Sequence, residues 1–285
     1  MRQLCVRNTL KINMWLIVGV SGATCSGKST VAQSLHKQLP GSFLVCQDDF
    51  FLPVDSQQHT LIPALNHINW EIMTSLDMEK MHAVIENCLF SDSAKTVLPI
   101  TSLVEAVNRV AGSPLHAESD KIGTALNINT GCHRAIPEDM VQFKPDGTQS
   151  MATCEIDTDN ISSKTKMADG HGDKQILGVR ILIIEGFLIF NDKKIADLCH
   201  CKYFLTLTRE QCWARRSVRP YDPPDVPGYF DQCIWPEYEK HRDEVFKQVP
   251  NVIVIDGNQN RTSVLKQVLL GITQRAHELL QLQKS

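Results

Sequence analysis

A short run near the start of the chain places glycines, a lysine and a serine at a fixed spacing. The pattern G-x-x-x-x-G-K-[ST] lies between an apolar stretch and a helical one and is fitted by Gly22, Gly27, Lys28 and Ser29. Glycines in such a loop let consecutive backbone N–H groups point at phosphate oxygens, and the helix N-terminus adds its positive dipole end. The lysine reaches the β- and γ-phosphates, and the serine hydroxyl binds Mg²⁺. The spacing therefore predicts a triphosphate site made of Gly22, Ala23, Thr24, Cys25, Ser26, Gly27, Lys28, Ser29 and Thr30.

Two carboxylates directly follow apolar runs elsewhere in the chain. Asp48 comes after the run 43–46, where it faces the γ-phosphate and can orient an acceptor hydroxyl and take its proton. Because the transition state of phosphoryl transfer is loose, an ordinary carboxylate suffices. Glu185 ends the run 179–184, as an acid that holds Mg²⁺ directly or through water does. The alternative for Asp48 is a solvated turn or a helix cap.

Basic and aromatic side chains form a second group of candidates. Arg215, Arg216 and Arg219 lie on or just after one predicted helix, with Arg215 and Arg219 on the same face. Guanidinium groups there can close over a transferring phosphoryl group and neutralise its charge, although a solvated charged face is the alternative. Trp70 and Tyr221 lie in turn-rich surroundings, where stacking on a flat ligand ring and ordinary packing are both consistent with the sequence.

The elements that must position these groups alternate between short apolar runs and helical patterns. This alternation predicts right-handed crossovers and a parallel sheet. The expected fold class is α/β, a P-loop NTPase fold with a five-stranded parallel sheet and helices on both faces. Ligands bind at the carboxyl ends of such strands, where the candidate residues all fall. We expect strands at 15–20, 43–46, 179–184, 202–208 and 252–255, and helices at 29–39, from a cap at Ser75 to about 89, and at 209–219, 230–248 and 261–282.

The alternation of apolar runs and helical patterns stops between residues 91 and 176. This segment is rich in Ser, Thr, Asp, Asn and Gly, and its apolar residues come singly apart from a weak helical patch at 98–110. We predict a largely disordered insertion of low order, with a small folded subdomain as the alternative. The expected organisation is an N-terminal extension at 1–13, a P-loop domain at 14–90 and 177–285, and the insertion at 91–176.

Composition limits the partners of the chain. A formal net charge of −3 over 285 residues argues against nucleic acid, and no apolar run approaches the roughly 18 residues of a membrane helix. Ten cysteines without a C-x-x-C pair indicate reduced thiols and a cytoplasmic protein, with the nucleus as a second compartment. The basic, apolar N-terminus mimics a signal peptide, but cleavage at 21–23 would cut the phosphate loop. An organelle presequence within residues 1–13 stays an alternative.

Four stretches together resemble the nicotinamide riboside kinases, in the uridine-kinase-like branch of P-loop kinases. They are GATCSGKST (22–30), QDDFF (47–51), ILIIEGFLIFN (181–191) and RRSVRPYDPPDVPGYFDQCIWPEYEKHRDE (215–244). The resemblance covers about residues 14–90 and 177–280. It implies transfer of the γ-phosphate of ATP or GTP to the 5′-hydroxyl of nicotinamide riboside, or of nicotinic acid riboside. The product would be the mononucleotide used for NAD synthesis.

The resemblance also implies a role for each site residue. Asp48, Lys28 and Arg215 would be catalytic, and the Mg²⁺ would lie near Ser29, Asp48 and Glu185. The nucleotide would also contact Arg219 and Tyr221, with Asp256 to Arg261 at the adenine, among them Gln259, Asn260 and Arg261. The riboside would contact Asp48, Asp49, Phe50, Phe51, Trp70, Glu71, Arg216, Tyr221 and Asp222, and its pyridine ring would lie between Trp70 and Tyr221. Glu71 stands where the family usually has an Asp that binds the ribose 2′- and 3′-hydroxyls.

Other functions use much of the same machinery. Uridine, cytidine, pantothenate and other small-alcohol kinases of this fold differ from a riboside kinase in their pocket residues alone. A non-catalytic nucleotide-binding scaffold, with the insertion as its partner site, belongs to a different class. The presence of Lys28, Asp48 and Glu185 together argues against the scaffold. The expected partner is a small-molecule substrate, and the sequence names no protein partner for the insertion.

Overall fold

The computed structural model describes residues 15–90, 96–112 and 178–282. The predictions for the N-terminal extension at 1–13 and for most of the insertion lie outside these residues. All of the described residues belong to one compact unit of the chain.

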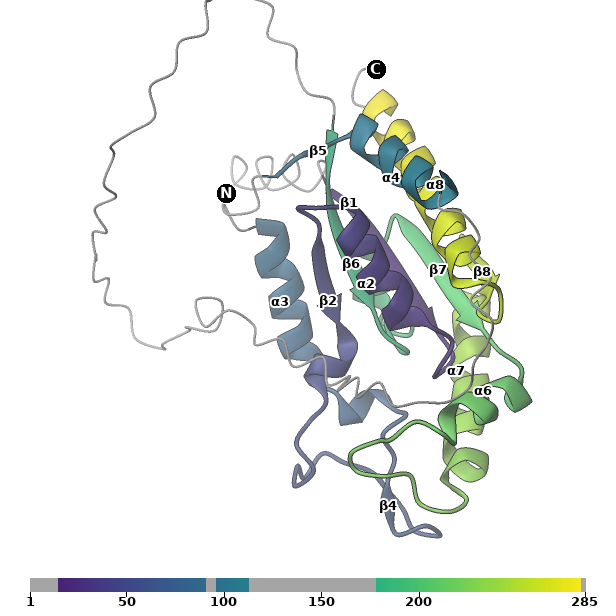
Figure 1. The fold of residues 1–285 in the computed structure, drawn as a ribbon. Coiled ribbons are helices and arrows are strands. Elements are labelled where there is room, and N and C mark those ends of the chain that lie inside the picture. The colour runs from purple at the N-terminus through teal and green to yellow at the C-terminus, as the bar shows by residue number, and fades with distance from the viewer. Residues whose placement is uncertain (1–14, 91–95, 113–177, 283–285) are drawn as a thin grey trace, which may run out of the picture. The chain divides into compact units, whose positions relative to one another are not determined.

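A parallel sheet lies at the centre of this unit (Figure 1). Its strands are near-continuous apolar runs, and every residue of the first strand is buried, as expected for a sheet covered on both faces. The five predicted parallel strands and the α/β class are thereby confirmed, and a short sixth strand, β5 (Leu98–Pro99), pairs antiparallel with the start of β6. In spatial order the parallel strands are β2 (Phe43–Cys46), β6 (Gly178–Glu185), β1 (Trp15–Gly22), β7 (Cys201–Thr206) and β8 (Val252–Asp256).

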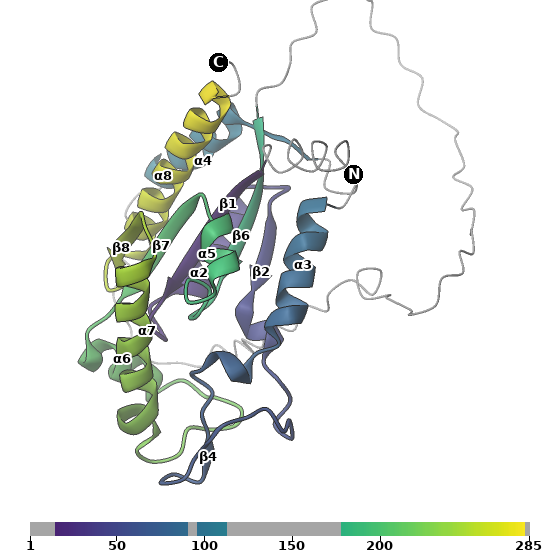
Figure 2. The same cartoon turned by 180° about the vertical axis from the view of Figure 1, so that it is seen from behind.

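Helices cover both faces of the sheet. Side chains alternate along a strand, so Leu16, Val18 and Val20 of β1 enter one core while Trp15 and Ile17 enter the other. The first core is covered by α2 (Lys28–Gln38), α4 (Ile100–Gly112) and α8 (Arg261–Leu282). The second is covered by α3 (Met78–Phe90), α5 (Lys193–Leu198) and α7 (Trp235–Gln248), which Figure 2 shows from the other side.

Shorter elements extend from the carboxyl ends of the strands and carry the candidate side chains. A helical turn, η1 (Gln47–Phe50), follows β2 directly, and the helix α6 (Arg209–Arg216) follows β7. The predicted helix at 230–248 begins as a π-helical segment, η4 (Phe230–Ile234), and continues without a break into α7. The remaining elements are η2 (Met73–Ser75) and a separate hairpin of β3 (Leu61–Ile62) and β4 (His67–Ile68).

Two predicted helix boundaries are wrong. The helix after Ser75 begins at Met78, and its first turn is capped by Asp77, whose Oδ1 accepts the N–H of Lys80 at 2.9 Å. Ser75 instead donates its hydroxyl to the carbonyl oxygen of Asn69 at 2.6 Å, inside the protein. The helix predicted at 209–219 ends at Arg216, so Arg219 lies beyond it.

The predicted domain boundary at residue 90 needs correction. Residues 98–112 form β5 and α4, and α4 packs against α8. Leu103, Ala106 and Val110 are buried in the first core, one helical turn apart. Apolar residues that come singly in the sequence are enough to form one apolar helix face when α8 supplies the opposite surface. This part of the segment 91–176 therefore belongs to the domain.

Among the described residues, no helix has both the length and the apolar character required to cross a membrane.

Candidate active site

The phosphate loop joins the end of β1 to the start of α2. Gly22 has a φ of 132°, and a Cβ at this position would lie 2.0 Å from the carbonyl oxygen of Leu205 on the neighbouring strand. Gly27 precedes α2 with a φ of 94°, in the left-handed region that glycine adopts without strain. The loop is also fixed to the sheet, since the N–H of Ala23 donates to Leu205 at 2.9 Å. Only glycine satisfies the backbone at Gly22, which explains that part of the sequence pattern.

The interior of this loop carries groups suited to a polyphosphate. The Lys28 ammonium donates to the carbonyl oxygen of Ala23 at 2.8 Å, so it lies over the loop. The hydroxyl of Ser26 is buried and has no hydrogen-bond partner among the described residues. The first turn of α2 contains no acidic residue that would offset the positive end of the helix dipole. These donors fit a triphosphate.

The carboxyl ends of β2 and β6 bring the two predicted acids to one place. Glu185 of β6 is in register with Cys46 of β2. Asp48 lies two residues after Cys46, in η1, and its side chain is exposed. Burial, together with the negative charge of Asp48, raises the pKa of the Glu185 carboxyl to about 7, although the charge of Lys28 and a hydrogen bond with Ser29 oppose the shift.

The donor atoms in this place are a hydroxyl and carboxylates, which are the hard oxygen ligands that Mg²⁺ prefers. Within the described ranges, no group of three or more His, Cys, Asp or Glu side chains is arranged to hold a metal ion. A magnesium ion here would therefore be held by Ser29 and one or both acids together with phosphate oxygens of the nucleotide and water, which is its usual mode of binding in kinases.

Arg215 links the phosphate loop to the segment after β8. Its Nη1 donates to the carbonyl oxygens of Cys25 at 3.1 Å and Gly257 at 3.2 Å, and its Nη2 donates to Oδ1 of Asn258 at 2.9 Å. This segment continues into the residues predicted to border the adenine, which are exposed. Arg215 thus holds together the phosphate loop and the segment after β8.

Arg216 points in a different direction and is buried. Its Nε and Nη2 donate to the two carboxylate oxygens of Asp225 at 2.7 and 2.9 Å, and its Nη1 donates to the Thr24 hydroxyl at 3.0 Å. Nη1 also lies 3.6 Å from Oε1 of Glu71. The ring of Tyr221 covers the guanidinium, with its centroid 4.2 Å from the central carbon. Neighbouring positions on α6 therefore serve two different parts of the site.

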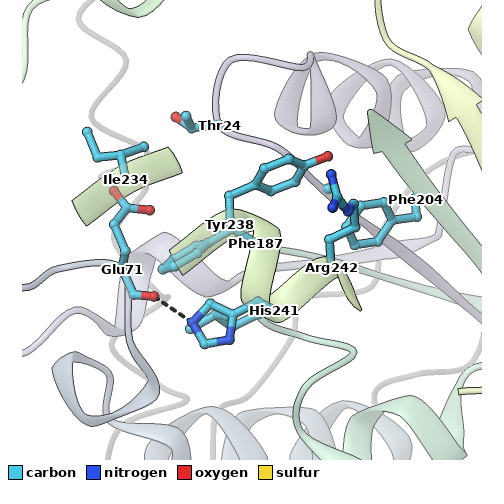
Figure 3. Close-up of a pocket in the computed structure, with 10 residues that line it drawn as sticks. Thr24, Glu71, Phe187, Phe204, Ile234, Tyr238, His241 and Arg242 are labelled. Carbon is cyan, nitrogen blue, oxygen red and sulfur yellow. Dashed lines mark hydrogen bonds between the residues drawn. The ribbon is translucent and has the colours of Figure 1, made fainter. Parts of the chain in front are cut away.

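Glu71 lies at one side of a pocket. Burial raises the pKa of its carboxyl to about 6, although the positive charge of Arg216 opposes the shift. Its backbone carbonyl accepts a hydrogen bond from Nε2 of His241 at 3.0 Å, and Figure 3 shows this bond beside the pocket. The pocket is lined by Gly22, Thr24, Glu71, Phe187, Leu188, Phe204, Ile234, Tyr238, His241 and Arg242.

The aromatic candidates occupy two separate surroundings. Trp70 meets Phe51 edge to face at a centroid distance of 5.7 Å, and His59 at 4.6 Å. Phe51 in turn stacks on Phe187 at 5.9 Å. Tyr221 instead lies against Arg216, and its hydroxyl is 3.2 Å from the Cys25 sulfur. A pyridine ring held between Trp70 and Tyr221 therefore stays a prediction.

No family model matches the chain. Nicotinamide riboside kinase 1 of Mus musculus is 28% identical over 258 residues, which cover 90% of this chain and 94% of that protein. The Homo sapiens nicotinamide riboside kinase 1 is 29% identical over 252 residues (88% and 89%), and the human nicotinamide riboside kinase 2 is 28% identical over 259 residues (90% and 80%). Over about 90% of its length the chain is therefore similar to nicotinamide riboside kinases.

The structure brings together most of the predicted groups. The phosphate loop lies with Asp48, Glu185 and Arg215 in one part of the site. Glu71 lines the pocket, and Arg216 lies beside Glu71. Arg219 is exposed and its guanidinium lies 5.1 Å from the Tyr221 ring centroid. The other predicted contacts stay predictions, with exposed side chains at Thr30, Asp49, Phe51, Asp222, Gln259, Asn260 and Arg261 and a buried one at Phe50.

Sequence reasoning missed three residues of this site. Asp225 is the partner of Arg216, His241 holds the backbone of Glu71, and Phe187 stacks on Phe51. His241 lies 170 residues from Glu71, so no local pattern links the two. Asp225, Phe187 and His241 all fall within the stretches that resemble the family, and this was the signal available for them.

Proposed function

We propose that this protein transfers the γ-phosphate of ATP to the 5′-hydroxyl of nicotinamide riboside and releases the mononucleotide. The observation that carries the proposal is the meeting of Asp48, Glu185 and Ser29 at the mouth of the phosphate loop. A base, a metal-binding acid and a triphosphate loop at one place are what phosphoryl transfer to an alcohol requires. The product is a pyridine nucleotide for NAD biosynthesis.

Each side chain has one task in this proposal. Asp48 orients the riboside 5′-hydroxyl and accepts its proton, and its exposed position leaves it accessible to the acceptor. Lys28 and Arg215 stabilise the charge on the phosphates. Magnesium, when bound with the nucleotide, supplies further neutralisation of phosphate charge. Ser29 and Glu185 would hold it, and Asp48 lies close by.

The riboside side depends on Glu71 and Arg216. A carboxylate that accepts hydrogen bonds and a guanidinium that donates them, with Oε1 and Nη1 3.6 Å apart, match two neighbouring sugar hydroxyls. Glu71 has one methylene more than Asp, so its carboxylate extends further toward the sugar hydroxyls. The affinity for ribose is therefore the property that this residue is most expected to change. Nicotinic acid riboside is a second acceptor of the same shape.

The donor and the compartment are also part of the proposal. ATP is the donor in it, with GTP as the alternative. The seven cysteines in the described part are all free thiols, and we place the protein in the cytoplasm, a reducing compartment.

A parallel assay tests the proposal. ATP consumption with Mg²⁺ is measured for nicotinamide riboside, nicotinic acid riboside, uridine, cytidine and pantothenate, and the phosphorylated product is identified by mass. We expect the highest kcat/KM with a pyridine riboside, and no turnover for Lys28→Ala above background. A preference for uridine or cytidine would assign the protein to the uridine kinase branch instead. Nucleotide binding without turnover of any acceptor would favour the scaffold.

A further inference from the structure

Asp225 lies outside every site predicted from the sequence, yet it makes the shortest contacts of Arg216. Its two carboxylate oxygens accept from Nε at 2.7 Å and from Nη2 at 2.9 Å, a bidentate pair. The side chains of Arg216 and Asp225 are only 7% and 26% exposed. Pairing of this kind fixes the plane of the guanidinium as well as its charge.

The remaining N–H groups of Arg216 are directed by this pair. A guanidinium has five, of which Asp225 takes two and the Thr24 hydroxyl takes one at Nη1, 3.0 Å away. One N–H therefore remains on Nη1 and one on Nη2. Nη1 is 3.6 Å from Oε1 of Glu71, too far for a good hydrogen bond but close enough for a ligand hydroxyl to contact both groups.

The segment after α6 supplies both of the groups that hold this arginine. Asp225 binds the edge of the guanidinium, and Tyr221 covers its face at 4.2 Å. The opposite edge contacts Thr24 of the phosphate loop. Arg216 consequently connects the segment 221–225 with the loop that binds phosphate and with Glu71.

We propose that Asp225 is a positioning residue, which holds the Arg216 guanidinium between Thr24 and Glu71 in the orientation that binds the hydroxyls of the acceptor. Asp225 acts through Arg216 and touches neither the acceptor nor the nucleotide. The inference rests on the proposed function, since it assumes that the acceptor is a sugar-bearing alcohol bound beside Glu71.

The first test compares Asp225→Asn with Asp231→Asn. Asp231 is the matched control because it pairs with Arg209 on the same helix, but both of those side chains are exposed. Asp225→Asn removes one half of the bidentate pair, and we expect kcat/KM for the riboside to fall about 10- to 100-fold, mainly through KM. The KM for ATP and the melting temperature in the presence of ATP should change far less. Equal losses for ATP and riboside, or wild-type kinetics, would overturn the proposal.

A double-variant cycle separates positioning from a general effect on folding. Lysine cannot form the bidentate pair, so Arg216→Lys removes the group through which Asp225 is proposed to act. In the Arg216→Lys background, Asp225→Asn should cause no further loss in kcat/KM. In the wild-type background, Asp225→Glu should have a higher kcat/KM than Asp225→Asn, because it keeps the carboxylate. Losses that multiply in the double variant would show that Asp225 acts by another route.

A spectroscopic measurement tests the pairing without any assay of activity. In a ¹⁵N spectrum of the side chains, the Nε–H signal of Arg216 should exchange slowly with solvent in the wild-type protein and in Asp231→Asn. It should shift and exchange at least about ten-fold faster in Asp225→Asn. An unchanged signal would refute the positioning role even where riboside kinase activity is present. Absence of riboside kinase activity in the wild-type protein, with the signal behaving as expected, would instead refute the proposed function.

Discussion

Burial and the neighbouring negative charge of Asp48 both raise the pKa of Glu185 at the carboxyl ends of β2 and β6. The register of the sheet produces this relationship. Glu185 is paired with Cys46 at the end of β2, and Asp48 lies in the helical turn η1 that follows β2 directly. A buried acid next to a second acid has a cost for the fold, and it creates a concentration of negative charge where a divalent cation would be stabilised.

Replacement of Glu185 by Gln should change how stability depends on pH. The pKa of Glu185 rises from an ordinary value of 4.5 to about 7, so between these values the folded protein holds a proton that the unfolded chain releases. Stability should therefore fall as pH rises through this window. We expect the melting temperature of Glu185→Gln relative to wild type to increase from pH 5 to pH 8, without nucleotide or metal. Glu79→Gln, on the exposed surface of α3, controls for the loss of one carboxylate; the same trend in both variants would contradict the assignment.

Replacement of Lys28 by Ala should weaken both nucleotide binding and turnover. The ammonium lies over the phosphate loop, where it neutralises charge that develops on the phosphates. We expect kcat to fall at least about 100-fold and the dissociation constant for ATP to rise, as measured by steady-state kinetics and calorimetry. Lys37→Ala, an exposed lysine on the same helix α2, should behave as wild type. Full activity of Lys28→Ala would refute the assignment of the phosphate site to this loop.

Replacement of Asp48 by Asn should separate binding from chemistry. The amide keeps the shape of the side chain but cannot accept a proton, so kcat should drop about 100- to 10,000-fold while ATP still binds. Asp55→Asn, in the exposed loop that follows, is the control. Near-wild-type turnover of Asp48→Asn would show that another group removes the proton.

Replacement of Arg215 by Ala should loosen the nucleotide side of the site. Its guanidinium joins the carbonyl oxygens of Cys25 and Gly257, and no shorter side chain can span both. We expect the KM for ATP to rise about ten-fold or more, with a smaller effect on the KM for the riboside. Arg209→Ala on the same helix is exposed and should leave both constants unchanged. The reverse pattern, a selective loss of riboside affinity, would place Arg215 on the acceptor side.

Replacement of Leu103 by Ala tests whether α4 belongs to the domain. Leu103 is 0% exposed in the first core, so truncation should lower the free energy of unfolding by about 2–5 kcal/mol in denaturant titrations. Val104 is adjacent but 40% exposed, and Val104→Ala should cost less than about 1 kcal/mol. Equal effects of the two substitutions would argue that α4 does not depend on this packing.

Local patterns were sufficient for much of the fold. Each parallel strand is a compact apolar run, and the glycines at 22 and 27 mark the turn that the phosphate loop requires. The helix α4 was not predicted as part of the domain, because its apolar residues are sparse and become a core face only against α8. Ser75 was predicted as a helix cap from its residue type, but Asp77 takes that role and Ser75 bonds to Asn69.

The sequence by itself determined which groups can bind phosphate, take a proton or hold a metal ion, because these depend on residue types and short spacings. The tertiary structure alone decided which groups meet. Arg215 and Arg216 are neighbours in the chain, yet one contacts Cys25 and Gly257 while the other contacts Asp225 and Thr24. Such pairings depend on how helices and loops pack on the sheet, and the free energy of that packing is spread over contacts far apart in the sequence, where no local pattern records it.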